Sequence, residues 1–326
     1  MTLPRRLLPG TTLEPSVIGL GTAPFGVEPT RDDSFAILDA FAEAGGNFID
    51  TAHCYSDWVP GERGRSEKII GQWMRKSEMR DKLVLATKGG HPPFSKERQI
   101  CLSSEKLNSD LSESLDRLQT DRIDLYWLHR DEPERPVGEI VDTLNGFVRD
   151  GRVKYFGGSN WTVKRLQMAN DYAKRNKQAG FAANQPWWSL GVSAMRSHGR
   201  HGLTVMDAET YRFHCETKMP VVAYTAQANG YFSKHLGEAP DDPAKIAKSL
   251  YHTESNRRLA QKLHTLSKQS GASVTALVLA FLVHQPFPVY PLIGPRTLEQ
   301  LRASISAAQA KISPETTSHL LALENY

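Results

Sequence analysis

The stretch GGNFIDTAHCYSDW (residues 45–58) contains a short apolar run that follows a glycine pair and ends on a carboxylate, Asp50. Tyr55 comes five residues after Asp50, in a segment with little helical or strand character. A short apolar run bounded by turn residues is typical of a buried strand. We therefore predict a strand that ends at Asp50 and a loop that carries Tyr55.

Seven further runs of this kind are spaced along the chain: VIGLG (17–21), LVLATK (83–88), DLYWLH (124–129), VKYFGGS (153–159), FAANQ (181–185), PVVAY (220–224) and VYPLIG (289–294). The segments between them repeat apolar residues at helical spacing, as in Phe35, Leu38 and Phe41. Thr30 can cap this first helix and Gly45 follows its end. Strands that do not alternate polar with apolar residues indicate a parallel sheet buried on both faces.

Eight strand–helix units predict a single (β/α)8 TIM barrel over residues 1–326, with extended loops on its C-terminal face. A doubly wound Rossmann sheet is the rival architecture, but no G-x-G-x-x-G sextet and no phosphate-loop motif occur. We also predict an N-terminal hairpin at 5–16, long loops at 186–206 and 226–253, and a C-terminal helix at 313–325. In a barrel both loops follow strand ends, so we expect them to form pocket walls.

The composition excludes several classes of partner. The net charge of +4 is spread along the chain without a basic run, which argues against nucleic-acid binding. The longest apolar run, ALVLAFLV, is far shorter than the ~20 residues that span a bilayer, so we expect no membrane association. No signal peptide is recognisable at the N-terminus. We expect a cytoplasmic protein.

The cysteine and histidine patterns give no metal or disulfide framework. Cys54, Cys101 and Cys215 are scattered and form no C-x-x-C, which is typical of a reducing compartment. His198 and His201 have a spacing that metal sites use, but no cysteine or carboxylate accompanies them. We predict no metal site.

Three of the predicted strands end on chemically active residues: Asp50, Lys88 and His129. In a barrel these side chains and Tyr55 would converge on one mouth. A tyrosine with a pKa near ~10 is a poor acid, but a nearby ammonium favours its phenolate and lowers that value. Such a set suits proton donation to a carbonyl oxygen as a hydride arrives at carbon, or the reverse. Taken alone, each residue is more often a turn former or a packed side chain, and the functional interpretation depends on their occurring together at consecutive strand ends.

The motifs FIDTAHCY, LATK, DLYWLHRDEP, GGSNW, NQ, AYTAQANG and LIGPRTLEQL occur in this order. Together they resemble the aldo-keto reductase superfamily over residues 16–308. The resemblance implies that Tyr55 is the general acid and base, that Asp50 and Lys88 tune it, and that His129 polarises the carbonyl.

The resemblance also implies a nicotinamide cofactor extended across the barrel mouth. Ser159, Asn160 and Gln185 would hydrogen-bond its carboxamide, and Tyr224 would stack on the ring. The backbone from Thr225 to Gly230 would approach the pyrophosphate. The complete set of implied cofactor residues is Gly21, Thr22, Ser159, Asn160, Gln185, Tyr224, Thr225, Gln227, Gly230, Gly294, Arg296, Gln300 and Ser304.

The segment IGPRTLEQLRAS bears on the choice between NADP and NAD. It enters a helix, whose N-terminal amides can meet a phosphate. Arg296 can pair with a 2′-phosphate, which favours NADP (NADPH). Many family members carry Glu-Asn to hold adenine where this chain has Ala303 and Ser304. NAD therefore stays an alternative, although Gln300 keeps its expected place.

The loop SDWVPGERGRSE is longer than the family often shows. Trp58, Trp187 and Trp188 could line a pocket for a ring-shaped or sugar-like substrate, since indoles offer large stacking faces. Ordinary packing is the alternative for all three. The expected function is an NAD(P)H-dependent oxidoreductase that interconverts an aldehyde, ketone or sugar carbonyl and its alcohol. A sugar dehydrogenase acting oxidatively with NAD, and a cofactor-binding regulatory or redox-sensing protein, remain alternatives.

Overall fold

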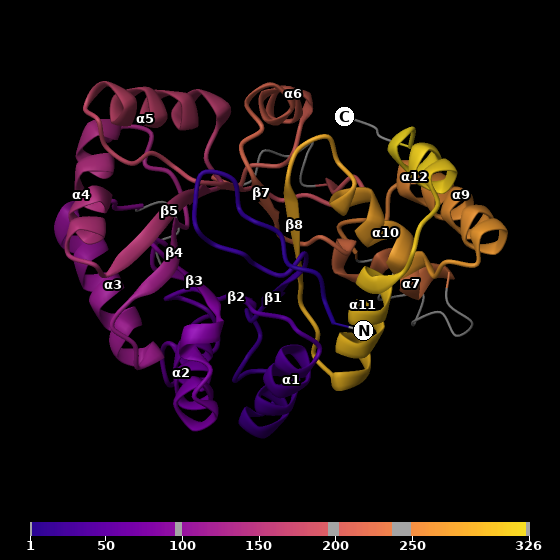
Figure 1. Cartoon of the computed structure of the whole chain (residues 1–326), viewed down its shortest axis with the longest axis horizontal. Helices are drawn as coiled ribbons and strands as arrows, with labels where there is room; N and C mark the ends of the chain where they lie inside the picture. Colours follow the sequence, from indigo (N-terminus) through magenta and orange to yellow (C-terminus); the bar gives the residue numbers. More distant parts are fainter. Residues whose placement is uncertain (1, 95–99, 195–201, 237–248, 324–326) are drawn as a thin grey trace.

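The computed structural model describes residues 2–94, 100–194, 202–236 and 249–323. Its eight strands are all parallel and close into a barrel in the order of the sequence, with the helices outside (Figure 1). This confirms the predicted (β/α)8 architecture. The strands are β1 (Gly19–Gly21), β2 (Phe48–Asp50), β3 (Val84–Gly89), β4 (Ile123–Leu128), β5 (Val153–Ser159), β6 (Asn184–Gln185), β7 (Val221–Ala223) and β8 (Val289–Ile293).

The helices alternate with these strands. They are α1 (Arg31–Glu43), α2 (Arg65–Ser77), α3 (Ser104–Leu118), α4 (Val137–Arg149), α5 (Val163–Arg175), α6 (Ala208–Thr217), α7 (Tyr231–Leu236), α9 (Glu254–Ser270), α10 (Val274–Val283), α11 (Leu298–Gln309) and α12 (Pro314–Leu321), with short 3₁₀ turns η1 (Arg80–Lys82) and η4 (Ala228–Gly230). The N-cap predicted for α1 is confirmed, because the Thr30 side chain accepts a hydrogen bond from the Asp33 N–H.

Alternate strand residues fill the inside of the barrel. Phe48, Ala86, Leu125 and Tyr290 belong to one buried apolar cluster. A strand turns every second side chain to the same face, so Asp50, Lys88 and Trp127 point inward as well, one step nearer the C-terminal end. Inside the barrel, the charged side chains therefore lie directly on the C-terminal side of the apolar layer.

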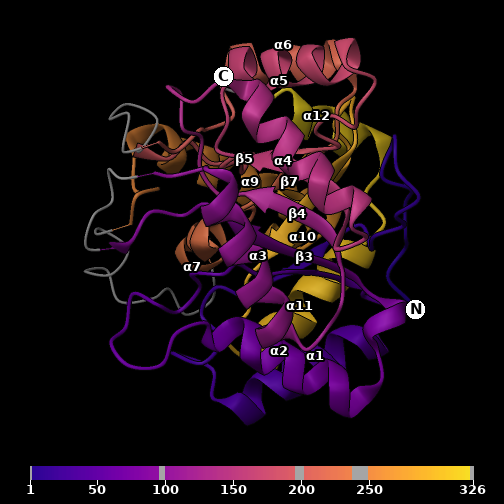
Figure 2. The same cartoon turned by 90° about the vertical axis from the view of Figure 1, so that its left-hand side faces the viewer.

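The N-terminal segment closes the opposite end of the barrel. Arg5 and Ser16 form an antiparallel bridge, and the Arg6 N–H donates to Pro15 O at 3.0 Å. Leu8 and Leu13 join the interior cluster. Figure 2 shows this segment on the right, away from the loops that follow the strands on the left. The C-terminal mouth, by contrast, is where the polar ends of the described strands lie.

The segment between β7 and β8 is long, and within the predicted loop 226–253 the described residues include the short helical elements η4 and α7. It contains η4, α7, α9 and α10, although residues 237–248 lie outside the described part of the chain. Helix α10 carries the apolar run ALVLAFLV and is buried on almost every side by other elements. Among the described helices no single one could span a membrane, and α9 with α10 meets the length and hydropathy requirement only as a pair bent by 99°.

The predicted loop 186–206 is anchored at both ends. The Trp187 N–H donates to Thr204 O at 2.9 Å, and the Met206 N–H donates to Trp187 O at 3.0 Å. Its middle, residues 195–201, lies outside the described residues, and His198 and His201 fall there. In the described ranges no cluster of three or more His, Cys, Asp or Glu side chains could hold a metal ion.

Candidate active site

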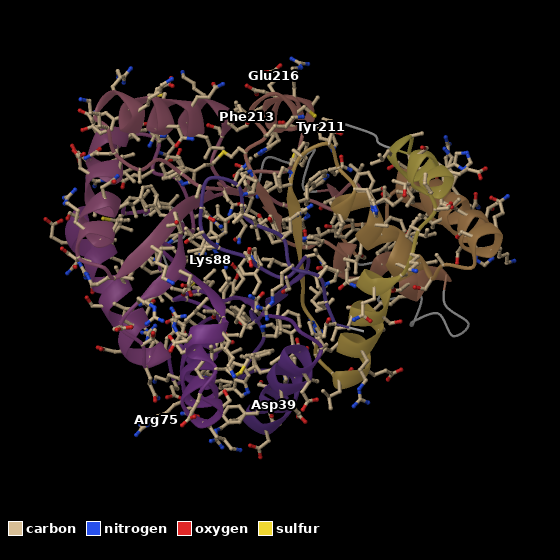
Figure 3. All side chains as sticks on the ribbon, in the orientation of Figure 1. Asp39, Arg75, Lys88, Tyr211, Phe213 and Glu216 are labelled. Carbon is tan, nitrogen blue, oxygen red and sulfur yellow. The ribbon has the colours of Figure 1, made fainter. Side chains whose placement is uncertain are left out.

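Four side chains singled out in the sequence meet at the C-terminal mouth. Asp50 is the last residue of β2, Lys88 lies near the end of β3, and His129 directly follows β4. Tyr55 stands in the β2–α2 loop. Lys88 lies near the middle of the barrel in Figure 3.

Asp50 and Lys88 form a buried ion pair. Each side chain is 1% exposed. Lys88 Nζ donates to Asp50 Oδ2 and, at 2.7 Å, to Thr51 O. The second oxygen, Asp50 Oδ1, accepts from Trp127 Nε1 and from Gln185 Nε2, both at 3.0 Å. Burial opposes the ammonium charge, but Asp50 and Tyr55 together raise the pKa of Lys88 above its ordinary value. Lys88 therefore stays positively charged at neutral pH and is held in place by its hydrogen bonds.

The Lys88 ammonium lies 4.6 Å from the centre of the Tyr55 ring. Burial raises the pKa of Tyr55 above 10, although Lys88 pulls that pKa down. Lys88 acts in the expected direction, but the net pKa is raised because burial disfavours the phenolate more than Lys88 favours it. The phenol keeps its proton at neutral pH, which suits a proton donor.

His129 packs edge-on against Tyr55, with ring centres 5.8 Å apart and planes at 76°. Burial, reinforced by the Arg130 guanidinium, lowers the pKa of His129 well below 6.5, so the imidazole is neutral. Its Nδ1 lies 3.6 Å from Cys54 Sγ. Burial raises the pKa of the Cys54 thiol to about 12, which keeps it protonated and unreactive. A neutral imidazole can hydrogen-bond a carbonyl oxygen without adding charge.

The residues predicted to hold the carboxamide lie together at the ends of β5, β6 and β7. Asn160 Nδ2 donates to His129 O at 3.1 Å and to Ser159 Oγ at 3.2 Å. Its Oδ1 accepts from Tyr224 OH at 2.6 Å and from the Thr204 N–H at 3.2 Å. Every hydrogen-bonding atom of the Asn160 side chain is thus engaged, and a carboxamide would have to replace one of these partners.

The backbone beside these residues adopts unfavourable conformations. Asn160, Thr225, Ala228 and Asn229 have φ of 62°, 56°, 50° and 54°. A left-handed conformation costs a non-glycine residue about 1–3 kcal/mol, and such residues cluster at functional sites. Of the other described non-glycine residues with positive φ, Glu78, Gln119 and Lys218 cap helix C-termini, Lys177 follows the cap of α5, and Ser56 follows Tyr55. The strain is therefore concentrated at the mouth.

The turn from β8 into α11 is open to solvent. A Cβ added at Gly294 would meet nothing within 4 Å, which leaves room for a ligand. Arg296 is exposed and pairs with Glu28 at 2.8 Å. Gln300 Oε1 accepts from the Arg296 N–H at 2.9 Å, so this amide oxygen is engaged by the residue before the N-cap of α11. Further along the helix, Ser304 has a different partner.

Two of the predicted cofactor-binding segments contact each other directly. Gln227 Nε2 donates to Ser304 Oγ at 3.1 Å, which joins the turn after β7 to α11. Gly230 has φ of 76° in the same turn. At the end of β1, Gly21 is half-buried, whereas Thr22 is fully buried and its hydroxyl donates to Asp50 O at 3.1 Å. Thr22 therefore ties β1 to β2, a structural contact.

The three tryptophans have different environments. Trp58 is 46% exposed at the mouth. Trp187 is half-buried, and its indole N–H donates to Tyr251 OH at 2.6 Å. Trp188 is 3% exposed and stacks on Phe287 in the apolar core. The prediction that Trp188 lines the substrate pocket is wrong, because the side chain packs against neighbouring helices.

A row of aromatic rings leads from solvent to the tyrosine. Neighbouring centroids are 6.3 Å apart for Trp58–Phe94, 5.0 Å for Phe94–His91, 4.8 Å for His91–His129 and 5.8 Å for His129–Tyr55. We call these five residues the aromatic row. Phe94 is 39% exposed, so the outer end is accessible.

Sequence reasoning missed His91, Phe94, Arg130 and Trp127. The position of Trp127, two residues before His129 in a strand, could have placed it on the same face. The others lie in loops after β3 and β4, where any residue can reach the mouth. Nothing in their spacing distinguishes them.

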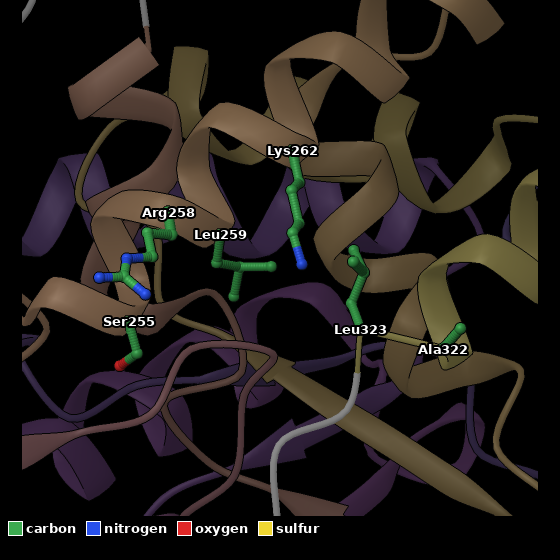
Figure 4. A pocket seen from close by; sticks show the side chains of 6 residues that line it. All are labelled: Ser255, Arg258, Leu259, Lys262, Ala322 and Leu323. Carbon is green, nitrogen blue, oxygen red and sulfur yellow. The ribbon is translucent and has the colours of Figure 1, made fainter.

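A pocket elsewhere lies between α9 and the residues that follow α12 (Figure 4). None of the predicted site residues contributes to it. Its lining residues are Ser255, Arg258, Leu259, Lys262, Ala322 and Leu323.

Comparison with known proteins agrees with this geometry. Residues 17–325 match the Aldo/keto reductase family. The chain belongs to this family. It is 32% identical to the uncharacterized oxidoreductase YrpG of Bacillus subtilis, over 94% of this chain and 91% of that protein. It is 29% identical to norsolorinic acid reductase B of Dothistroma septosporum, over 95% of this chain and 78% of that protein. It is also 29% identical to the putative aryl-alcohol dehydrogenase AAD14 of Saccharomyces cerevisiae, over 89% of this chain and 76% of that protein.

Aldo/keto reductases generally use NAD(P)H. The mouth has polar groups of the kind that bind such a cofactor, although a carboxamide would have to displace a present partner of Asn160. Amide and hydroxyl groups lie beside the half-buried Tyr224 ring, Gly294 has no neighbour within 4 Å of an added Cβ, and Arg296, two residues later, is exposed. Family and geometry together support a carbonyl–alcohol oxidoreductase.

Proposed function

We propose that the protein is an NAD(P)H-dependent oxidoreductase that interconverts a carbonyl group and its alcohol, with Tyr55 as the proton donor and acceptor. The observation that carries the proposal is the buried Lys88–Asp50 pair beneath the Tyr55 ring, next to a neutral His129. A bound nicotinamide would supply or accept the hydride.

Each residue then has one task. Tyr55 gives its hydroxyl proton to the carbonyl oxygen, and the ammonium of Lys88 stabilises the phenolate that remains. Asp50 keeps Lys88 charged and in place. His129, being neutral, donates a hydrogen bond to the same oxygen and orients the carbonyl. In the oxidative direction the Tyr55 phenolate takes the proton back.

The cofactor would lie across the mouth, with Ser159, Asn160 and Gln185 near its carboxamide and Tyr224 against its ring. The turn from Thr225 through Gln227 to Gly230 would face the pyrophosphate. The β8–α11 turn would hold the adenosine end, with Arg296 pairing with a 2′-phosphate. NADPH is thus the favoured cofactor and NADH the alternative.

For the substrate we propose a small molecule with a planar ring. The accessible end of the aromatic row, Trp58 with Phe94, offers two ring surfaces for stacking. Two of the relatives are named for norsolorinic acid and for aryl alcohols. A sugar carbonyl remains the alternative, since sugars also stack on indoles.

The function is tested by two measurements on the wild-type protein. Equilibrium titrations with NADPH and NADH, followed by quenching of tryptophan fluorescence, establish whether a cofactor binds. Turnover on a panel of aromatic aldehydes, aliphatic aldehydes and sugars then establishes the reaction. Binding without any turnover would favour the regulatory or redox-sensing alternative, and absence of binding would contradict both.

The pH dependence should differ between the two directions. Reduction needs protonated Tyr55, whose pKa lies above the ordinary value of about 10. We expect kcat for reduction to stay flat between about pH 6 and 9 and to fall at higher pH, while kcat for oxidation rises with pH throughout. His129 adds no ionisation in this range because its pKa is far lower. A fall in reductive kcat near neutral pH would contradict Tyr55 as the acid.

Phe94→Ala should affect aromatic substrates selectively. The change removes one of the two exposed ring surfaces, and an aromatic contact contributes about 0.5–1.5 kcal/mol. We expect KM for a benzaldehyde to rise about three- to tenfold, with kcat and the KM of a short aliphatic aldehyde nearly unchanged. Leu250→Ala, at a similarly exposed apolar side chain outside the aromatic row, is the control. Equal losses for both substrates would rule out stacking.

A further inference from the structure

The β1–α1 turn brings a carboxylate to the proposed phosphate site. Glu28 Oε2 lies 2.8 Å from an Arg296 guanidinium nitrogen. The two residues are far apart in sequence but meet because β1 pairs with β8 where the barrel closes. The Arg296 side chain is 59% exposed and the Glu28 side chain 47% exposed. An ion pair this open to solvent is weak enough to be exchanged for another.

The backbone fixes the position of Glu28. Its N–H donates to Pro24 O at 3.2 Å, and the Gly26 N–H donates to Pro29 O at 3.3 Å. Gly26 has φ of +82°, a conformation that suits glycine, and Pro29 is buried. The carboxylate is therefore presented from a tight, anchored turn.

Arg296 is fixed in the same way at its main chain. Its N–H donates to Gln300 Oε1, and the Gln300 N–H donates to Thr297 Oγ1 at 3.2 Å. These two hydrogen bonds hold the backbone at the start of α11. The Arg296 guanidinium is the part of the residue that can exchange one anionic partner for another. A guanidinium binds carboxylate and phosphate oxygens with the same fork of N–H groups, so the two anions compete for it.

We propose that Glu28 is a cofactor-selectivity residue that lowers the preference for NADPH over NADH. The inference rests on the proposed function, since it requires a dinucleotide at the barrel mouth. A 2′-phosphate must replace the Glu28 carboxylate on Arg296, so its binding gives up the existing ion pair. NADH carries a 2′-hydroxyl instead, so it can bind with the ion pair intact.

The test measures dissociation constants for NADPH and NADH by quenching of tryptophan fluorescence. Glu28→Gln should bind NADPH about two- to tenfold more tightly than the wild type, with NADH unchanged. Asp32→Asn is the matched control, because it removes the same charge from a nearby side chain that is 91% exposed and pairs with Arg31. It should leave both constants as in the wild type.

A double-mutant cycle identifies the route of the effect. In an Arg296→Ala background, Glu28→Gln should give no gain in NADPH affinity, because the partner for which the anions compete is gone. The inference is overturned if Glu28→Gln shifts NADPH binding no more than Asp32→Asn does. It is also overturned if the gain persists without Arg296. A wild-type protein that binds neither cofactor contradicts the proposed function and this inference together, whereas normal binding with no selectivity change contradicts the inference alone.

Discussion

Tyr55→Phe is expected to lower kcat for carbonyl reduction by about 10²–10⁴-fold, the usual contribution of a positioned proton donor. The phenylalanine keeps the ring that packs between Lys88 and His129 and removes only the hydroxyl. Cofactor binding should therefore be nearly unchanged, since Tyr55 is not among the residues proposed to hold it. Single-turnover kinetics with preloaded cofactor would measure the chemical step.

The matched control for this change is Tyr211→Phe, which removes a phenolic hydroxyl in α6 that donates to Gln285 Oε1 at 2.9 Å. We expect full activity from it. If Tyr55→Phe were also fully active, the proton would have to come from another group and the proposed mechanism would be wrong. A loss of cofactor affinity equal to the loss of rate would instead place Tyr55 among the binding residues.

Lys88→Met is expected to lower both stability and activity. It leaves the Asp50 carboxylate buried without its cation, and breaking one side of a buried ion pair costs about 3–5 kcal/mol in the free energy of unfolding. The hydrogen bonds from Trp127 and Gln185 to Asp50 remain and limit the loss. Urea unfolding followed by circular dichroism measures the change. Activity should fall at least as far as in Tyr55→Phe, because the phenolate loses its counter-ion.

An exposed ion pair provides the comparison. Lys68 pairs with Glu62 at 2.6 Å, with side chains 38% and 61% exposed. Lys68→Met should cost less than about 1 kcal/mol and leave kcat unaltered. If Lys88→Met were as stable as Lys68→Met, the buried pair of Lys88 with Asp50 would not stabilise the fold, and this prediction would be wrong.

The barrel itself was predictable from the sequence. Eight apolar runs separated by helical patterns define the strand–helix alternation, and the strand ends follow from where each run meets a polar residue. Asp50, Lys88 and His129 could be assigned to one mouth because parallel strands in a closed barrel all end on the same side. These three residues could be grouped because they end three consecutive strands, and strand ends are visible in the local sequence pattern.

The loops were much less predictable. Nothing in the sequence distinguishes Trp58, Trp187 and Trp188, yet of these three Trp58 joins the aromatic row while Trp188 is in the core. Phe94 and His91 carried no signal at all. Loop residues are placed by contacts with other loops, and no period in the sequence records such contacts.

The sequence by itself determined the architecture and the residues at the strand ends, since burial on both faces of a parallel sheet imposes a local pattern that can be read directly. Tertiary structure alone decided the electrostatics of the site. The direction of the Tyr55 pKa depends on how burial balances against Lys88, and the pairing of Glu28 with Arg296 depends on β1 meeting β8. Both depend on residues that are distant in the sequence and close in the fold, because charge and solvation act through space and not along the chain.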